Sequence, residues 1–178
     1  MYCTCTVQHQ HSVVNNTMAH RHPPQAQIIF APARPQVRGV KSIFLAGTTS
    51  KTAEADWRES LTASLEHLPI SLFNPLRADW DSSWREDISF APFREQVEWE
   101  LEMQERADIN VVYFGPHSEA PISLLELGLC ARSGKAIVAC HPDYKKRGNV
   151  QIVCQKLGLE FLDSASDLAK AVLERLNM

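Results

Sequence analysis

A glutamate surrounded by leucines is the residue whose setting points most directly to chemistry. Glu126 lies in the segment Pro121-Ile-Ser-Leu-Leu-Glu-Leu-Gly-Leu129, which follows a predicted strand and opens a predicted helix. A carboxylate in apolar surroundings is costly unless it is paired or used, and the helix start would favour an anion. Such a group suits nucleophilic attack on an electrophilic sugar carbon. The alternative, which local features alone favour, is a capping box of Ser123 and Glu126.

A turn rich in hydroxyl groups is a second candidate for ligand contact. Gly47, Thr48, Thr49 and Ser50 follow a short apolar run and precede a predicted helix. Their hydroxyls and backbone amides could hold a phosphate at the helix start. An ordinary helix cap is the commoner use of Ser and Thr there, and the segment matches neither a Walker loop nor GxGxxG.

A third candidate is the polar and aromatic segment Asn74-Pro-Leu-Arg-Ala-Asp-Trp-Asp81, with Trp84 shortly after it. Asp79, Trp80 and Asp81 could stack on and hydrogen-bond a base or a sugar. The aromatic residues could equally pin the loop to the core, and the sequence does not separate these two interpretations.

Glu98, Glu100 and Glu102 stand at alternate positions of one predicted helix. Residues two apart do not share a helix face. Most of these carboxylates should therefore be solvated, while one of them is free to face a crevice.

Apolar runs and amphipathic helical stretches alternate along the chain. Strands that are apolar throughout and alternate with helices predict a parallel sheet covered on both faces. We therefore expect an α/β fold with a single doubly wound sheet, flavodoxin-like or Rossmann-like, whose ligand crevice lies at the carboxyl ends of the strands. The predicted strands are 42–46, 70–73, 109–114, 136–140 and 160–162, and the predicted helices are 53–67, 93–108, 123–132, 149–157 and 166–176.

The composition excludes several classes of partner. The chain has 178 residues and a net charge of −3, whereas binding to nucleic acid requires clustered Lys and Arg. It contains no apolar run long enough for a transmembrane helix and no secretory h-region, so we expect neither a nucleic acid nor a membrane partner. Cys130, Cys140 and Cys154 lie in apolar surroundings that suit reduced thiols, which indicates a cytoplasmic protein.

The chain divides into three regions by composition. Residues 1–25 are polar and aperiodic, which predicts a disordered tail. Residues 26–40 should form an arm or an edge strand, and 41–178 the folded domain. The His and Cys residues of the tail match no closed tetrahedral pattern, so an unstructured tail is favoured over a metal site. We expect neither a metal nor a cofactor.

The stretch from Ser42 to about Gly158 resembles the nucleoside 2-deoxyribosyltransferase family and its nucleotide N-hydrolase relatives. Each motif alone is weak, and their order and spacing together carry the resemblance. The motifs are Phe44-Leu-Ala-Gly47, Asn74-Pro-Leu-Arg-Ala-Asp-Trp-Asp81, Ala107-Asp108 before a strand, Ser123-Leu-Leu-Glu-Leu-Gly128 and Gly148-Asn-Val150.

The resemblance implies cleavage or transfer of the N-glycosidic bond of a nucleoside or nucleotide. Glu126 matches the family's nucleophile, which implies a covalent glycosyl-enzyme and net retention. Glu100 matches the carboxylate that handles the base, and Gly128 would let its helix pack closely. Asn149 matches a residue supplied by a neighbouring subunit, which implies a homodimer or larger homo-oligomer with a shared site. The expected substrate contacts are Phe44, Gly47, Thr48, Thr49, Asn74, Asp79, Trp80, Asp81, Ser123 and Asn149.

Two positions depart from the family pattern. Phe44 stands where the family usually has Tyr, and Ala120 stands where transferases commonly have Asp. Hydrolysis, or transfer on a modified nucleoside, is therefore an alternative to classical deoxyribosyl transfer. A module of the same fold that binds or senses a nucleotide without turnover is the alternative from another functional class.

Overall fold

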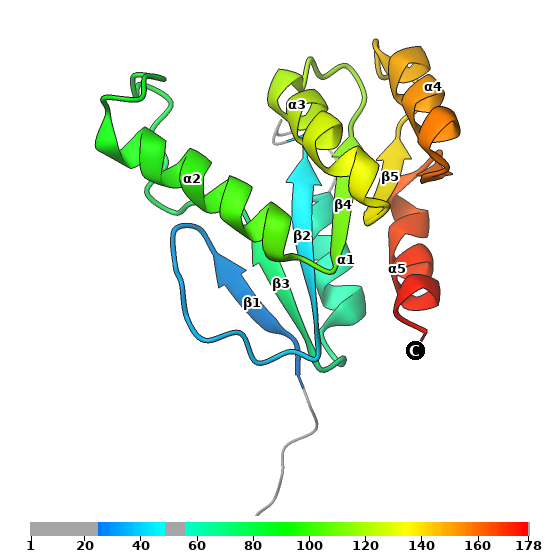
Figure 1. The fold of residues 1–178 in the computed structure, drawn as a ribbon, viewed down its shortest axis with the longest axis horizontal. Coiled ribbons are helices and arrows are strands. Elements are labelled where there is room, and N and C mark those ends of the chain that lie inside the picture. The colour runs from blue at the N-terminus through cyan, green and yellow to red at the C-terminus, as the bar shows by residue number, and fades with distance from the viewer. Residues whose placement is uncertain (1–24, 49–55, 178) are drawn as a thin grey trace, which may run out of the picture.

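A computed structural model describes residues 25–48 and 56–177. Within these ranges the chain forms one six-stranded parallel sheet of order β1-β3-β2-β4-β5-β6, flanked by helices (Figure 1). The strands are β1 Gln27–Phe30, β2 Lys41–Gly47, β3 Ile70–Asn74, β4 Ile109–Phe114, β5 Ala136–Cys140 and β6 Glu160–Leu162. The helices are α1 Trp57–Leu65, α2 Ala91–Arg106, α3 Pro121–Cys130, α4 Arg147–Leu157 and α5 Leu168–Leu176, with 3-10 turns η1 Ala131–Ser133 and η2 Ala165–Asp167.

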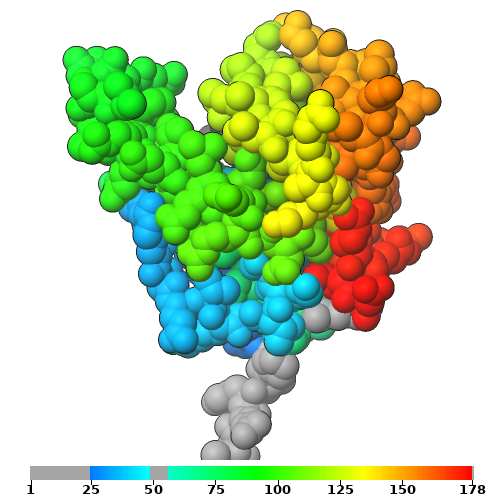
Figure 2. Space-filling model, viewed as in Figure 1, coloured from blue at the N-terminus to red at the C-terminus, as the bar shows by residue number. Residues whose placement is uncertain are grey.

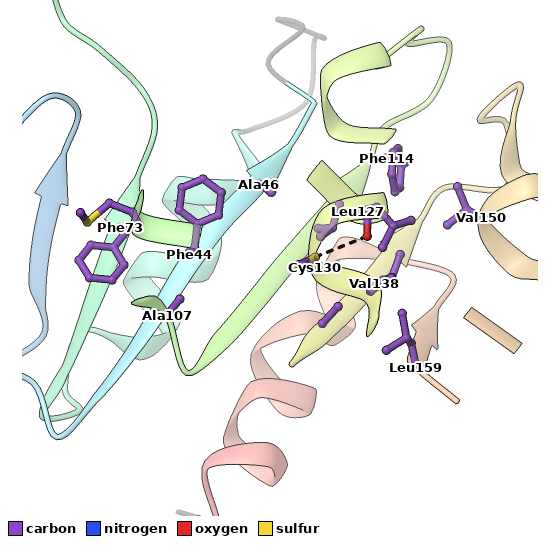
Figure 3. Packing of buried hydrophobic residues seen from close by; sticks show 14 of the residues in the cluster. Phe44, Ala46, Phe73, Ala107, Phe114, Leu127, Cys130, Val138, Val150 and Leu159 are labelled. Atoms are coloured by element: carbon purple, nitrogen blue, oxygen red, sulfur yellow. Dashed lines mark hydrogen bonds between the residues drawn. The ribbon is translucent and has the colours of Figure 1, made fainter. Parts of the chain in front are cut away.

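The sheet is buried on both faces, because β2 to β5 carry apolar side chains at nearly every position. Helices α2, α3 and α4 cover one face, where Trp99, Leu127 and Val150 pack on the strands. Helices α1 and α5 cover the other through Leu61 and Val172. Figure 3 shows the first of these cores. The predicted α/β class with a doubly wound parallel sheet is confirmed.

The strand order places a topological switch between β2 and β4. The chain leaves β2 to form β3 on one side and returns to form β4 on the other side. The connecting helices α1 and α2 cover opposite faces of the sheet, so a crevice opens at the carboxyl ends of β2 and β4. Gly47 and Asn74 end their strands at this edge, whereas the Ala107-Asp108 motif stands at the opposite edge, where the Ser42 amide donates to Asp108 at 2.9 Å.

The segment before β2 joins the sheet rather than standing apart from it. β1 pairs in parallel with β3, from Gln27 opposite Ser71 to Phe30 opposite Asn74, and forms the sheet edge. The following segment is tied to α2, since the Trp99 indole nitrogen donates to the Ala33 carbonyl at 2.8 Å. The expected disordered tail, residues 1–25, lies almost wholly outside the described residues.

None of the helices in residues 25–48 and 56–177 is long and apolar enough to cross a membrane. Cys130, Cys140 and Cys154 are buried and free, as their apolar neighbours predict. Burial raises the pKa of each of these thiols to about 11, so they stay protonated and unreactive near neutral pH.

Candidate active site

Glu126 lies in the second turn of α3, and this position excludes the capping box. The helix begins at Pro121, which suits a first helical position because its nitrogen needs no acceptor. Its N-cap is Ala120, in the left-handed conformation with φ 41° and without a side-chain cap. Ser123 is a buried residue inside the helix. The interpretation of Ser123 and Glu126 as a cap is therefore wrong, and so is the expected stabilisation of Glu126 by free N–H groups of the first turn.

Without those N–H groups, the Glu126 carboxyl is held in its neutral form by its surroundings. Burial, and then the nearby Glu100 carboxylate, raise the pKa of Glu126 to about 8, while the Arg58 guanidinium acts in the opposite direction. Helix α2 touches this turn of α3 directly, because the Gln104 side-chain amide donates to the Glu126 carbonyl at 3.2 Å. Glu126 is thus a half-buried acid that titrates near neutral pH, the range useful for acid–base or nucleophilic chemistry.

Of Glu98, Glu100 and Glu102 on α2, Glu100 is the one that is half-buried near Glu126. The Gln96 amide donates at 2.8 Å to Glu100 Oε1 and at 2.8 Å to the Pro75 carbonyl, which links α2 to the end of β3. Burial raises the pKa of Glu100, while the Gln96 hydrogen bond and the Arg58 charge lower it. Glu98 is exposed and Glu102 pairs with Arg34 on the surface.

Arg58 is a site residue that the sequence reasoning missed. Its side chain is 1% exposed and donates to the carbonyls of Leu45 (3.2 Å), Thr48 (3.0 Å) and Gly47 (2.8 Å) at the end of β2. Burial lowers the pKa of Arg58 to about 10, against the opposing effects of Asp56, Glu126 and Glu100. The sequence does indicate that Arg58 is unusual. It has helical spacing to Leu61 and Leu65, which places a charge on the apolar face of α1.

The turn after β2 is built for close packing. Gly47 has φ +136°, and a Cβ there would lie 2.4 Å from the Tyr113 carbonyl oxygen of β4. The buried Thr48 hydroxyl accepts from the Gly115 amide at 2.9 Å and lies 3.2 Å from the Ser118 hydroxyl. This hydroxyl therefore ties β2 to the loop before α3, rather than facing a phosphate as expected. Thr49 lies outside the described residues.

The segment 74–84 folds largely onto itself. Asn74 is buried and its side-chain oxygen accepts from the Leu76 amide at 3.0 Å. Arg77 pairs with Asp79 at 2.7 Å and with Glu95 at 2.8 Å, and its guanidinium lies 5.1 Å from the Trp84 ring centroid. Trp80 packs on Trp84 at 5.1 Å between centroids, and Asp81 accepts from Ser83. Between the two interpretations of the loop, these contacts favour a structural role for Trp84 and Asn74, while Trp80, Asp79 and Asp81 remain exposed.

Phe44 and Gly128 lie in settings that differ from the predicted ones, and Asn149, which is expected to act from a neighbouring subunit, is exposed in its own chain. Phe44 has no exposed surface and packs on Trp99 with centroids 6.4 Å apart, so it lies in the core rather than in a crevice. Asn149 is exposed at the start of α4, which lies on the far side of α3 from α2 (Figure 1). Gly128 is exposed, and a Cβ there would meet nothing within 4 Å. The expectation that Gly128 allows close packing is therefore wrong within the single chain.

The surface of the described residues is hollowed next to α3. Figure 2 shows the surface hollowed between α3 and the segment formed by the 75–90 loop with the start of α2. Nowhere in the described ranges do three His, Cys, Asp or Glu side chains come together in a group that could hold a metal ion. Chemistry here would rest on Glu100, Glu126 and the charge of Arg58.

Comparison with known families decides the assignment. The model of the nucleoside 2-deoxyribosyltransferase like family matches residues 40–144. The chain belongs to this family. The matched span contains Arg58, Glu100 and Glu126, whereas Asn149 lies beyond it.

The fold of the chain is also similar to that of a protein of known structure. A crystal structure of a conserved protein from Enterococcus faecalis V583 has a similar fold, with a TM-score of 0.54 and 15% sequence identity over 76% of this chain and 98% of that chain. At this identity the likeness concerns the fold. No curated protein matches the chain.

Proposed function

We propose that this deoxyribosyltransferase-like protein cleaves or transfers the N-glycosidic bond of a nucleoside or nucleotide, with Glu126 as nucleophile and Glu100 assisting the departing base. Family membership supports nucleoside glycosyl chemistry in general. The observation that carries the mechanism is that Glu100 and Glu126 are half-buried carboxyl groups on two helices that touch, since the Gln104 amide of α2 donates to the Glu126 carbonyl of α3 at 3.2 Å. Paired carboxyl groups of this kind are the usual machinery for replacing a group at a sugar's anomeric carbon.

The chemical steps follow from the two carboxyl groups. Ionised Glu126 attacks C1′, and the C1′–N bond breaks with its electron pair leaving on the base nitrogen. Glu100 gives its proton to the base. Water or a second base then attacks C1′, which releases the Glu126 carboxylate, and the proton of the attacking group returns to Glu100. Two displacements at one carbon give net retention.

This sequence requires one proton on the carboxyl pair. Burial and mutual repulsion oppose the ionisation of both groups, so the pair retains a proton up to about pH 8. In a coupled pair that proton belongs to both groups. In the ligand-free protein the high pKa of Glu126 favours the proton on Glu126. The proton must therefore move from Glu126 to Glu100 as the substrate binds.

A panel experiment tests the proposal. The protein is incubated with ribonucleosides, deoxyribonucleosides and their 5′-phosphates, and released bases are separated by chromatography. Release by the wild type is expected, and a second base added to the mixture distinguishes transfer from hydrolysis. Thermal stabilisation by a ligand without release over long incubation would instead identify a non-catalytic binding module.

Glu100→Gln is expected to slow base release because the departing base loses its proton donor. For a nucleoside with a neutral base, kcat should fall by about 10²- to 10⁴-fold. An N7-methylated purine nucleoside already carries a positive charge on the base, which leaves without a proton, so its kcat should fall by less than about tenfold. Steady-state rates on the two substrates provide the measurement.

The control is Glu98→Gln on the same helix. Glu98 is exposed and lies 3.7 Å from Arg94 on the surface, so its loss should leave both rates unchanged. Equal losses on the two substrates in Glu100→Gln would contradict a proton-donating role for Glu100.

We also propose that the protein forms a homo-oligomer with a shared site. Ile122, Leu125 and Leu129 form an apolar stripe on α3 and are 58%, 59% and 54% exposed. Val97 and Leu101 of α2 are exposed as well. A self-complementary apolar stripe suits a two-fold contact between identical chains, and it lies on the helix that carries Glu126.

Leu125→Glu is expected to dissociate the oligomer, because it places a charge in the centre of the stripe. Sedimentation should then give the monomer mass, while Ile88→Glu in the 75–90 loop should not alter it. If Asn149 acts across the interface, a mixture of inactive Glu126→Gln and Asn149→Ala chains should recover about a quarter of the wild-type activity. A monomeric wild type would contradict this proposal.

A further inference from the structure

Arg58 is a buried cation whose position the glycosyl mechanism has not yet explained. It lies on α1, whose Trp57, Leu61 and Leu65 pack into the core on the sheet face opposite α2 and α3. Its guanidinium lies 4.6 Å from the Trp57 ring centroid and donates to the three carbonyls at the end of β2. A charge buried to this degree is costly unless it is paired or hydrogen-bonded, and the three carbonyl groups at the end of β2 supply that compensation.

Hydrogen bonds connect Arg58 to the loop that leads into α3. Arg58 Nη1 donates to the Thr48 carbonyl at 3.0 Å, and the Trp57 indole nitrogen donates to the same oxygen at 3.2 Å. The Thr48 hydroxyl accepts from Gly115 at 2.9 Å and contacts Ser118, whose hydroxyl donates to the Gly115 carbonyl at 2.9 Å. The guanidinium therefore holds the end of β2, and Thr48 in turn holds the loop that precedes the nucleophile's helix.

The charges around the carboxyl pair come from three helices. The charges of Glu100 on α2 and of Arg58 on α1 act on the pKa of Glu126, and the Glu126 charge raises the pKa of the Cys130 thiol on the same helix. Glu100 accepts from the Gln96 amide at 2.8 Å, the Arg58 charge lowers the pKa of Glu100, and the Asp56 charge at the start of α1 raises the pKa of Arg58. Among the described residues, Arg58 is the cation whose charge acts on both carboxyl groups. With one proton on the pair, the two glutamates and Arg58 together are electrically neutral.

We propose that Arg58 is a positioning residue: it fixes the end of β2 and, through Thr48, the loop that precedes α3, and its charge favours the carboxyl pair that holds a single proton. The contribution of Arg58 to catalysis rests on the proposed function. Arg58 touches no reacting atom and acts through Glu100 and Glu126. Its effect is to select the singly protonated pair, the form that contains both a nucleophile and a proton donor.

A titration without substrate tests whether the Arg58 charge lowers the pKa of Glu126. The pKa of Glu126 is obtained from the pH dependence of the stability difference between chains with Glu and with Gln at position 126, first with Arg58 and then with Arg58→Met. Loss of the guanidinium should raise the pKa by one unit or more, a tenfold or larger increase in proton affinity. Arg132→Met, which removes an exposed charge, should leave it unchanged. An unchanged pKa in Arg58→Met overturns the proposal.

Two further measurements cover the case in which Arg58→Met does not fold. Arg58→Lys keeps the charge but cannot reach all three carbonyls, so the pKa of Glu126 should stay within half a unit while kcat falls at least tenfold with KM nearly constant. In the wild type, carboxyl-carbon chemical shifts of Glu100 and Glu126 should show two separate steps, one of them above neutral pH. A single step near the ordinary carboxyl pKa overturns the proposal. Because the titrations need no substrate, they decide the inference even where no base release is detected.

Discussion

Glu126→Gln is expected to abolish base release and at the same time to stabilise the fold. Removing the nucleophile should lower kcat by at least about 10³-fold, because the covalent route is lost. Stability should increase because the wild-type carboxyl group is half-buried beside Glu100 without the N–H groups of a helix start. A glutamate that merely capped α3 would behave in the opposite way, since the loss of a cap destabilises a helix.

The gain in stability should depend on pH with a definite sign. The pKa of Glu126 is about 8 in the folded chain, above the ordinary value of 4.5. Between these values the folded protein keeps a proton that the unfolded chain has released, so wild-type stability falls as pH rises from 4.5 to 8. The advantage of Glu126→Gln should thus be absent at low pH and reach on the order of 2–4 kcal/mol at pH 8 and above.

Denaturant unfolding of both chains across this pH range provides the measurement, with base release assayed on the same samples. Glu98→Gln is the matched control, because it removes an exposed carboxylate and should change neither property by much. Glu126 would be ruled out as the nucleophile if Glu126→Gln kept wild-type activity. A stability difference that did not vary with pH would contradict the raised pKa.

Gly47→Ala is expected to destabilise the protein strongly, because the backbone of β4 leaves no room for a side chain at the end of β2. An added Cβ would lie 2.4 Å from the Tyr113 carbonyl oxygen and 2.7 Å from its nitrogen, both backbone atoms of a central strand. The φ of +136° is in addition strained for a residue with a side chain. We expect a loss of about 3 kcal/mol or more in unfolding free energy.

Gly128→Ala is the matched control for Gly47→Ala. Position 128 lies within α3, and a Cβ there would meet nothing within 4 Å. Alanine should therefore raise stability by about 0.5–1 kcal/mol, the usual gain on replacing glycine in a helix. Thermal unfolding of the two variants should give opposite shifts. A loss of stability in Gly128→Ala that depended on protein concentration would place Gly128 in the oligomer contact.

The fold class could be predicted from the sequence because burial leaves a recognisable pattern. Strands β2, β4 and β5 are apolar at nearly every position, and such strands are stable only when helices cover both faces. The carboxyl-edge rule then predicted that Gly47, Asn74 and Glu126 lie in one region, since the ends of parallel strands share an edge, and the resemblance to the family added Glu100. Motif order and spacing therefore determined the family and the location of the candidate site.

The tertiary structure alone decided how those residues are used. Whether Glu126 caps α3 depends on where the helix starts, and the left-handed Ala120 before Pro121 places that start too early for a cap. Whether Thr48 faces a ligand depends on the neighbouring strand, whose following residue Gly115 takes its hydroxyl. Local sequence carries neither fact, because each depends on backbone angles or on a partner far along the chain.

Arg58 is the clearest case of a residue whose role the local sequence does not show. The sequence placed a charge on the apolar face of α1, but its acceptors are carbonyl groups on β2, which any residue type would provide. Its guanidinium reaches the carbonyls at the end of β2 from one face of the sheet, while Glu100 and Glu126 come from helices on the other face. The sequence by itself determined which residues could react. The placement of α1 on one face of the sheet and of α2 and α3 on the other determined their charge environment, because electrostatic coupling depends on distance and burial in space rather than on separation along the chain.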